Sequence, residues 1–372
     1  MKNKGYLFFL LLMASVSLSA NQKMFINQVS PPDSVRFAKI ISAFQNWDIV
    51  SALNELKIIA NTRNPEDEAY FNFFKANITF YSWKQIDSTN ENTSLVVIDS
   101  AVKYYEQALS LNSTINFKRL YINSPKSGLD SCATVLARYA KMYFMNEEYL
   151  TAMKYYEKIL DFKTDPVYYT SAGLTAYKLT SYPKAQIYLN RALDLNPINE
   201  KAWIVLTEAY KSTNDTSNAI SSASKALLSD SLNQNLLLNY YNIVSYYNRE
   251  SEIAGAIKRL EKIRPQNDKL YSILGTHYLT KKEFVSAERN FIALAQKTGN
   301  FDQMLKLYFN WYLYLIETNV LRHQSGNSTD YIIARNEAVS LIKAKIKPYK
   351  LQKSEDRQVQ AILQYFAQEF DD

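Results

Sequence analysis

The side chains that most often carry out chemistry in proteins are scarce in this sequence. It holds two histidines, His277 and His323, and a single cysteine, Cys132. Neither histidine has a second histidine or a cysteine at the spacing of a zinc site, and no Gly-x-Ser-x-Gly turn supplies a nucleophile. The glycine-rich loops that bind nucleotide phosphates are also missing. The sequence therefore predicts a protein that is not an enzyme and that uses no metal or cofactor.

Two acidic clusters could supply paired carboxylates, but their setting indicates a structural role. Glu147–Glu148 lies in a turn between apolar segments, and Glu66–Asp67–Glu68 follows Pro65, where the first turn of a helix favours negative charge. Cys132 stands beside Ala133, so we expect a buried thiol. A lone cysteine cannot close an internal disulfide, and an intermolecular one is the alternative.

An alanine that returns at nearly regular intervals reveals how the chain is organised. Each of these alanines has apolar residues four and seven positions further on. A period of about 34 residues indicates stacked helical hairpins, each of which buries its apolar face against the next. The alanines are Ala152, Ala185, Ala219, Ala256 and Ala287.

A second pattern precedes each of these alanines. From Trp203 to Tyr210, bulky or small residues fall at i, i+3, i+4 and i+7, which places them on one stripe of a helix. A small residue at the third place allows the neighbouring helix to approach closely. The same stripe occurs at residues 136–143, 169–176, 240–247 and 271–278.

Together these patterns resemble the tetratricopeptide repeat (TPR), whose signature is Trp-x2-Leu-Gly-x2-Tyr, then Ala-x3-Phe, then Pro. The resemblance covers five repeats in residues 131–300, and the fourth, with Ala256, is the most divergent. It implies an all-α fold, a TPR-type alpha-solenoid that winds as a right-handed superhelix of antiparallel helix pairs. It also implies a scaffold that binds a protein or peptide partner along a concave groove lined by the first helix of each repeat.

The remaining segments differ from the repeats. Residues 1–20 combine Lys2 and Lys4 with a short apolar run, which predicts a signal peptide and an exported protein of the periplasm, cell envelope or extracellular space; a membrane anchor is the alternative. The composition also resembles exported TPR proteins of Bacteroidetes.

Residues 21–130 predict irregular hairpins with loops at 85–93 and 112–130. Residues 301–372 predict a loop at 323–330 and capping helices near 331–345 and 355–369. No later segment is long and apolar enough to span a membrane.

The charge distribution favours an acidic partner. Residues 131–300 hold 21 basic and 16 acidic side chains, whereas the segments on either side are balanced. Nucleic-acid binding is not expected, because this excess is small for a long solenoid. The lysine–asparagine arrangement with which some members of the family hold a carboxylate is not reproduced. Counted outward from the packing stripe, the residues expected in the groove are Lys141, Phe144, Tyr177, Lys178, Lys201, Lys211, Tyr241, Arg249 and Lys269.

The aromatic run Tyr308–Tyr314 leaves a second function open. Its rings could stack on sugars, as in a glycan-binding helical protein that resembles outer-membrane starch-binding proteins. The other interpretation, which we favour, is that the run packs in a core against the final helices.

Overall fold

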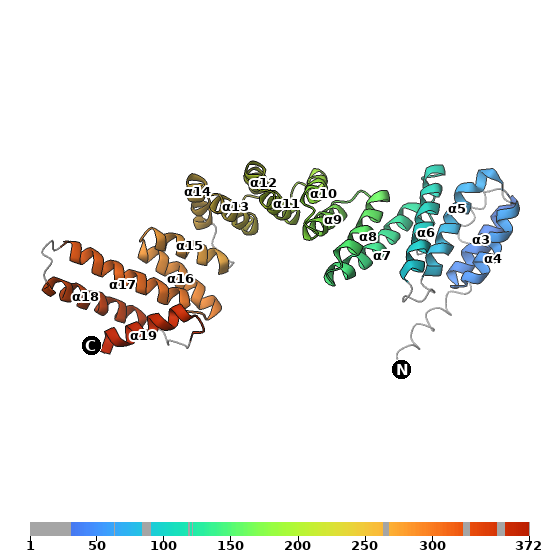
Figure 1. Ribbon diagram of the computed structural model, residues 1–372. Coiled ribbons are helices and arrows are strands. Elements are labelled where there is room, and N and C mark those ends of the chain that lie inside the picture. The colour runs from blue at the N-terminus through green and yellow to red at the C-terminus, as the bar shows by residue number, and fades with distance from the viewer. Residues whose placement is uncertain are drawn as a thin grey trace, which may run out of the picture. The chain divides into compact units, whose positions relative to one another are not determined.

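The computed structural model describes residues 31–62, 64–83, 91–117, 120, 122–262, 268–322, 328–347 and 354–371. Within these residues the regular structure consists of 17 α-helices and one short 3-10 helix, η1 (Pro65–Asp67) (Figure 1). The chain divides into two compact units, the N-terminal unit Met1–Asn196 and the C-terminal unit Pro197–Asp372. The signal peptide predicted for residues 1–20 lies outside the described residues.

The N-terminal unit consists of four consecutive helix pairs. In each pair an alanine of the second helix is fully buried, and these alanines are Ala52, Ala101, Ala152 and Ala185. The pairs are α3 (Pro31–Gln45) with α4 (Ile49–Thr62), α5 (Glu68–Trp83) with α6 (Glu91–Leu111), α7 (Pro125–Met145) with α8 (Tyr149–Phe162), and α9 (Pro166–Lys178) with α10 (Tyr182–Leu195).

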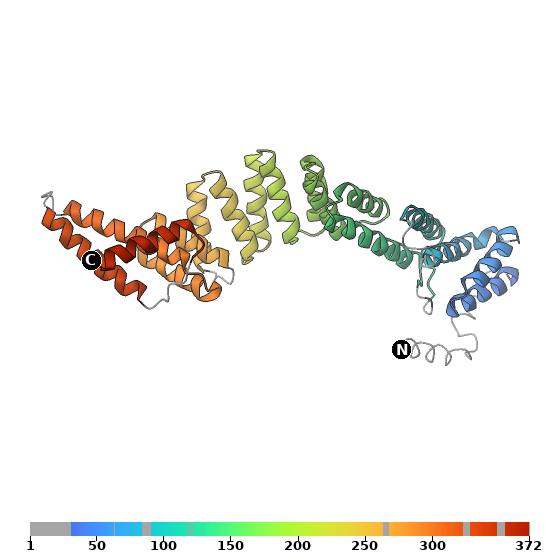
Figure 2. The same ribbon diagram turned by 60° about the horizontal axis from the view of Figure 1, so that its bottom comes forward.

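The C-terminal unit repeats this plan and adds one helix. Figure 2 shows its hairpins from a second direction. The pairs are α11 (Glu200–Ser212) with α12 (Thr216–Ser229), α13 (Gln234–Tyr246) with α14 (Glu250–Lys262), α15 (Asp268–Thr280) with α16 (Phe284–Thr298), and α17 (Asp302–Arg322) with α18 (Ser328–Ile346). The last helix, α19 (Arg357–Asp371), packs on α17 and α18.

Six of the hairpins turn in the same way. A residue with a left-handed backbone follows the first helix, and the next residue donates its N–H to a carbonyl five positions back, as Asp215 does to Tyr210 at 2.9 Å. This hydrogen bond satisfies a carbonyl at the helix end and reverses the chain. The left-handed residues are Trp47, Glu147, Thr180, Asn214, Asn248 and Lys282, with φ between 51° and 65°.

From α9 to α17, the first helices of successive hairpins begin at a fixed interval. Pro166, Glu200, Gln234, Asp268 and Asp302 each start a helix, and this constant spacing is the one that defines the TPR. The residue before three of these helices caps the new helix, because the side-chain oxygens of Asp165, Asn199 and Asn233 accept backbone N–H groups at 2.9–3.1 Å. The prediction of an all-α, TPR-type solenoid is confirmed.

The fourth repeat corrects the sequence-based register. Ile253, not Ala256, lies three residues after the start of its helix, as Ala219 does in the third repeat. The register expected from Tyr240–Tyr247 and Ala256 was therefore three residues late. The apolar residues of α14 allow both readings, and only the position of the hairpin turn distinguishes them.

The predicted loops are shorter than expected. α7 begins at Pro125, inside the loop expected at 112–130, and its first turn is closed by reciprocal hydrogen bonds between Ser124 and Ser127. Gly128 lies in this helix, where a Cβ atom would lie 2.4 Å from the Tyr105 ring. The glycine therefore serves close helix packing and not a loop.

Two further loops are also partly helical. α6 begins at Glu91, within the predicted loop 85–93, and α18 begins at Ser328, within the predicted loop 323–330. Residues 84–90 and 323–327 lie outside the described part of the chain. The predicted final helices correspond to α18 and α19.

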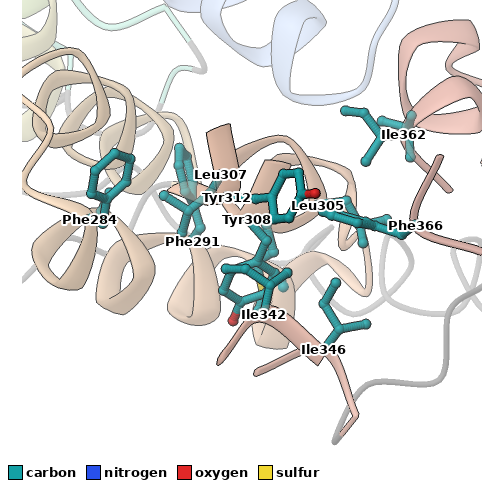
Figure 3. Close-up of a cluster of buried hydrophobic side chains, with 14 of the residues drawn as sticks. Phe284, Phe291, Leu305, Leu307, Tyr308, Tyr312, Ile342, Ile346, Ile362 and Phe366 are labelled. Carbon is teal, nitrogen blue, oxygen red and sulfur yellow. The ribbon is translucent and has the colours of Figure 1, made fainter. Parts of the chain in front are cut away.

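The aromatic run of α17 lies in the core of the C-terminal unit. Tyr308 is 1% exposed and Tyr312 is 0% exposed (Figure 3). Trp311 stacks on Phe284 at 5.3 Å between ring centroids, and the Lys345 ammonium lies 5.0 Å from the Trp311 centroid. These contacts confirm the core-packing interpretation of the run.

The single cysteine is buried as expected. Cys132 in α7 is fully buried, and this burial raises the pKa of its thiol far above the ordinary value. The thiol is therefore protonated at neutral pH, which makes it a packing residue and not a nucleophile.

Candidate partner-binding surfaces

The first helices of the N-terminal unit present an exposed stripe, which we call the α7–α9 surface. On α7 the exposed residues recur at helical spacing. On α9 the two ends of the stripe are exposed, and the half-buried Ser171 and Leu174 lie between them. Thr134 on α7 and Tyr168 on α9 lie close enough to interact, so the two helices are neighbours. The exposed residues are Thr134, Arg138, Lys141, Met142, Met145, Val167 and Lys178.

Positive charge on the α7–α9 surface has no acidic counterpart among the described residues. Arg138, Lys141 and Lys178 are exposed, and none of the described carboxylates lies within ion-pair distance of them. Two acidic residues of the same region are already engaged, because Asp130 pairs with Lys163 and Asp165 caps α9. The most exposed apolar residues beside the cations are Met145 and Val167, at 71% and 63% exposure. The surface thus combines apolar contact area with cations that have no acidic partner in the described part of the chain.

The corresponding helices of the C-terminal unit form the α11–α15 surface. Its exposed residues include Lys201, Asn235, Asn242, Tyr246, Lys269 and Thr276. Here one cation is compensated internally: the Lys211 ammonium lies 3.3 Å from a Glu208 carboxylate oxygen and 4.7 Å from the Tyr246 ring centroid. α13 itself contains no charged residue. This surface therefore combines polar residues and one compensated cation with the exposed Lys201 and Lys269.

The predicted groove residues take several different positions. Lys141, Lys178, Lys201 and Lys269 are exposed on the first helices. Two others lie half-buried beside hairpin turns, where each contacts an aromatic residue of the following helix. These pairs are Phe144 with Tyr149, at 5.2 Å between ring centroids, and Tyr177 with Tyr182, at 5.7 Å.

Tyr241 and Arg249 are misplaced by the register error in the fourth repeat. The half-buried Tyr241 packs against the core of the C-terminal unit that contains Leu236 and Leu237. Arg249 lies in the turn between α13 and α14, where its guanidinium pairs with Glu252 at 2.8 Å. A shift of three residues turns a helix position by about 300°, so an expected surface residue becomes a packing residue.

Three prominent surface residues were not selected from the sequence. Arg138 and Met145 lie on the same stripe of α7 as Lys141, three positions before it and four positions after it. Tyr246 ends α13, 55% exposed, and was obscured by the wrong register. The spacing around Lys141 could have identified the first two, because residues three and four apart share a helix face.

Arg138 has a defined position on the α7–α9 surface. Its guanidinium carbon lies 5.6 Å from the centroid of the Trp83 ring at the end of α5 and 5.8 Å from that of Tyr139. Both distances fall within the range of a cation–π interaction. The rings therefore restrain the guanidinium while leaving the side chain exposed to solvent.

Metal sites and membrane-spanning helices are absent from the described part of the chain. Within these ranges, no cluster of three or more histidine, cysteine, aspartate or glutamate residues could hold a metal ion. None of the described helices has both the length and the apolar character needed to cross a membrane.

No family model matches the sequence, and no curated protein matches it. Among solved structures, a tetratricopeptide repeat protein from Parabacteroides merdae is 16% identical, over 74% of this chain and 97% of that one, with a TM-score of 0.35. The type IV pilus biogenesis factor PilW is 16% identical, over 64% and 97%, with a TM-score of 0.35. The first TPR domain of Spaghetti, bound to the HSP90 peptide SRMEEVD, is 22% identical, over 31% and 93%, with a TM-score of 0.29. Scores of this size carry no conclusion, and the fold follows from the protein's own helices.

Proposed function

We propose that this protein is a non-catalytic scaffold that binds a segment of another protein on its first helices. The observation that supports the proposal is the α7–α9 surface, where Arg138, Lys141 and Lys178 have no acidic partner among the described residues and lie beside exposed Met145 and Val167. Cations without a described partner, next to exposed apolar side chains, favour an acidic segment that also carries aliphatic residues.

Site-specific photo-crosslinking tests this proposal. A photoreactive amino acid at Met145 or Val167 should crosslink the partner in an extract of the source organism. The same group at Ile187, on the second helix α10 and 68% exposed, is the matched control. We expect yields several-fold higher at the first-helix positions. Equal yields at all three positions would show that the first helices are not the binding face.

The proposal places the protein in the periplasm or cell envelope. The support is the sequence of residues 1–20, with two lysines, an apolar run and small residues before Asn21. N-terminal sequencing of the protein from fractionated cells tests this. A chain that begins near Asn21 in the envelope or periplasmic fraction is expected, whereas a chain that retains Lys2 in the cytosol contradicts export.

A further inference from the structure

Arg138 is the best-oriented cation of the α7–α9 surface. Trp83 and Tyr139 restrain its guanidinium, and Trp83 belongs to α5, two helices earlier in the chain. An arginine held on aromatic rings loses less rotamer freedom on binding, and its planar N–H donors match a carboxylate. None of the described groups accepts a hydrogen bond from those donors.

A second cation lies one helical turn away. Lys141 follows Arg138 by three positions on the same exposed stripe, and side chains at this spacing are about 5–6 Å apart. Met142 and Met145 continue the stripe and are 45% and 71% exposed. In an extended peptide, side chains two positions apart are separated by about 7 Å. Two carboxylates in an acid-x-acid pattern can therefore reach Arg138 and Lys141 together.

We propose that Trp83, Arg138 and Lys141 form an anchor for paired carboxylates in an extended acidic segment of a partner protein. Arg138 and Lys141 bind the carboxylates, Trp83 positions the guanidinium, and Met142 and Met145 contact an aliphatic side chain next to the acids. This inference rests on the proposed function and specifies the chemistry of the partner.

Fluorescence anisotropy with the full chain and two labelled peptides tests the anchor. The probe is fluorescein-GSLELELSG, and its neutral control is fluorescein-GSLQLQLSG. The wild-type protein should bind the acidic peptide at least about tenfold more tightly than the neutral one, because charge-assisted hydrogen bonds are lost in the control. A single-stranded oligothymidylate serves as competitor.

Substitutions identify the residues responsible. Arg138→Gln should weaken binding of the acidic peptide about tenfold or more, and Arg138→Lys should weaken it less, since the charge remains but the fork of donors is lost. Lys154→Gln is the matched control, because Lys154 is an exposed lysine on the second helix α8. It should leave binding unchanged.

The positioning role of Trp83 has its own readout. Trp83→Leu should reduce the difference in affinity between the acidic and neutral peptides, while Trp83→Phe, which keeps a ring under Arg138, should restore it. Circular dichroism and thermal melting establish that each variant is folded. If Trp83→Leu does not fold, the comparison of Arg138→Gln with Arg138→Lys still decides whether the Arg138 guanidinium binds the acidic peptide.

Several outcomes would overturn the anchor. These are equal affinity for both peptides, no effect of Arg138→Gln, absence of binding, or displacement of the peptide by oligothymidylate at lower concentration than by unlabelled acidic peptide. If crosslinking still maps a natural partner to Met145 and Val167, the anchor fails while the proposed function stands. If crosslinking fails as well, both are wrong.

Discussion

The two units of this protein have the same kind of interior and present two different surfaces. Gly173 in the N-terminal unit and Gly275 in the C-terminal unit lie at the same repeat position, and each allows a side chain of the following helix to pack against the backbone. The exposed stripes differ, since the cations of the α7–α9 surface have no described acidic partner, whereas Lys211 on the α11–α15 surface is neutralised by Glu208. Packing thus fixes the repeat, and surface positions are free to specialise.

The largest expected effect tests the common interior. A Cβ atom on Gly173 would lie 2.5 Å from Leu189, and one on Gly275 would lie 2.4 Å from Phe291. Overpacking of this kind costs about 1–3 kcal/mol, partly offset by the higher helix propensity of alanine. Gly173→Ala and Gly275→Ala should therefore destabilise their own units to a similar degree, as measured by hydrogen exchange with mass spectrometry.

Gly255 provides the control for this experiment. It lies in α14, where an added Cβ atom would have no atom of a neighbouring side chain or helix within 4 Å. Gly255→Ala should therefore stabilise its helix by about 0.5–1 kcal/mol. A destabilised Gly255→Ala variant, or a large difference between Gly173→Ala and Gly275→Ala, would show that the two interiors are not equivalent.

The next effect tests the contrast between the surfaces. Lys178→Glu reverses a charge that no described carboxylate pairs with, so binding of an acidic peptide to the α7–α9 surface should weaken about tenfold. Lys211→Glu, on the α11–α15 surface, should change that affinity by less than about twofold, because Glu208 already neutralises Lys211. Isothermal titration calorimetry measures both. Equal losses for the two variants would remove the distinction between the surfaces.

A smaller effect concerns the turns that both units use. Thr180 and Asn214 occupy the same left-handed position, with φ of 58° and 55°. A β-branched residue is strained there, while asparagine tolerates it. Thr180→Gly should raise stability by about 1 kcal/mol, and Asn214→Gly should leave it nearly unchanged, as followed by urea unfolding. Similar changes for both would mean that the N-terminal turn stores no extra strain.

The smallest effect is a pH response confined to one unit. The histidine that the structure describes, His277, lies in the C-terminal unit, and burial together with the Lys281 charge lowers its pKa. The neutral form of His277 contributes to the stability of the folded protein. This contribution is full above the pKa of the unfolded state, about 6.5, and is lost as the pH falls through the lower pKa of the folded state. Hydrogen-exchange protection of α15 and α16 should fall from about pH 7 to about pH 5. His277→Gln should reduce that fall, and an identical fall in the variant would exclude His277 as the cause.

Much of the fold was predictable because a helical hairpin is specified locally. Buried alanines such as Ala152, Ala185 and Ala219 recur with the repeat, and their spacing identifies the second helices. The start of α7 was not predictable in this way, since Pro125 and Gly128 have the composition of a loop. Gly128 is helical because the Tyr105 ring of α6 occupies the space that a side chain would need.

The surface was less predictable than the fold. Lys141, Lys178, Lys201 and Lys269 are exposed where the helix stripe put them, but Tyr241 packs inward because two registers of α13 satisfy the same apolar spacing. A register shifted by three residues fits the apolar spacing almost as well, but it changes which residues lie on the packing face of the helix.

The sequence by itself determined that this chain is all-helical, that its helices pair with the regular period of the TPR, and that its charge excess lies in the repeats. These properties depend on contacts between residues close in the chain. Only the tertiary structure decided the register of the fourth repeat and which of the described cations lack partners. It also decided that Arg138 rests on Trp83, because such contacts join side chains from helices far apart in sequence.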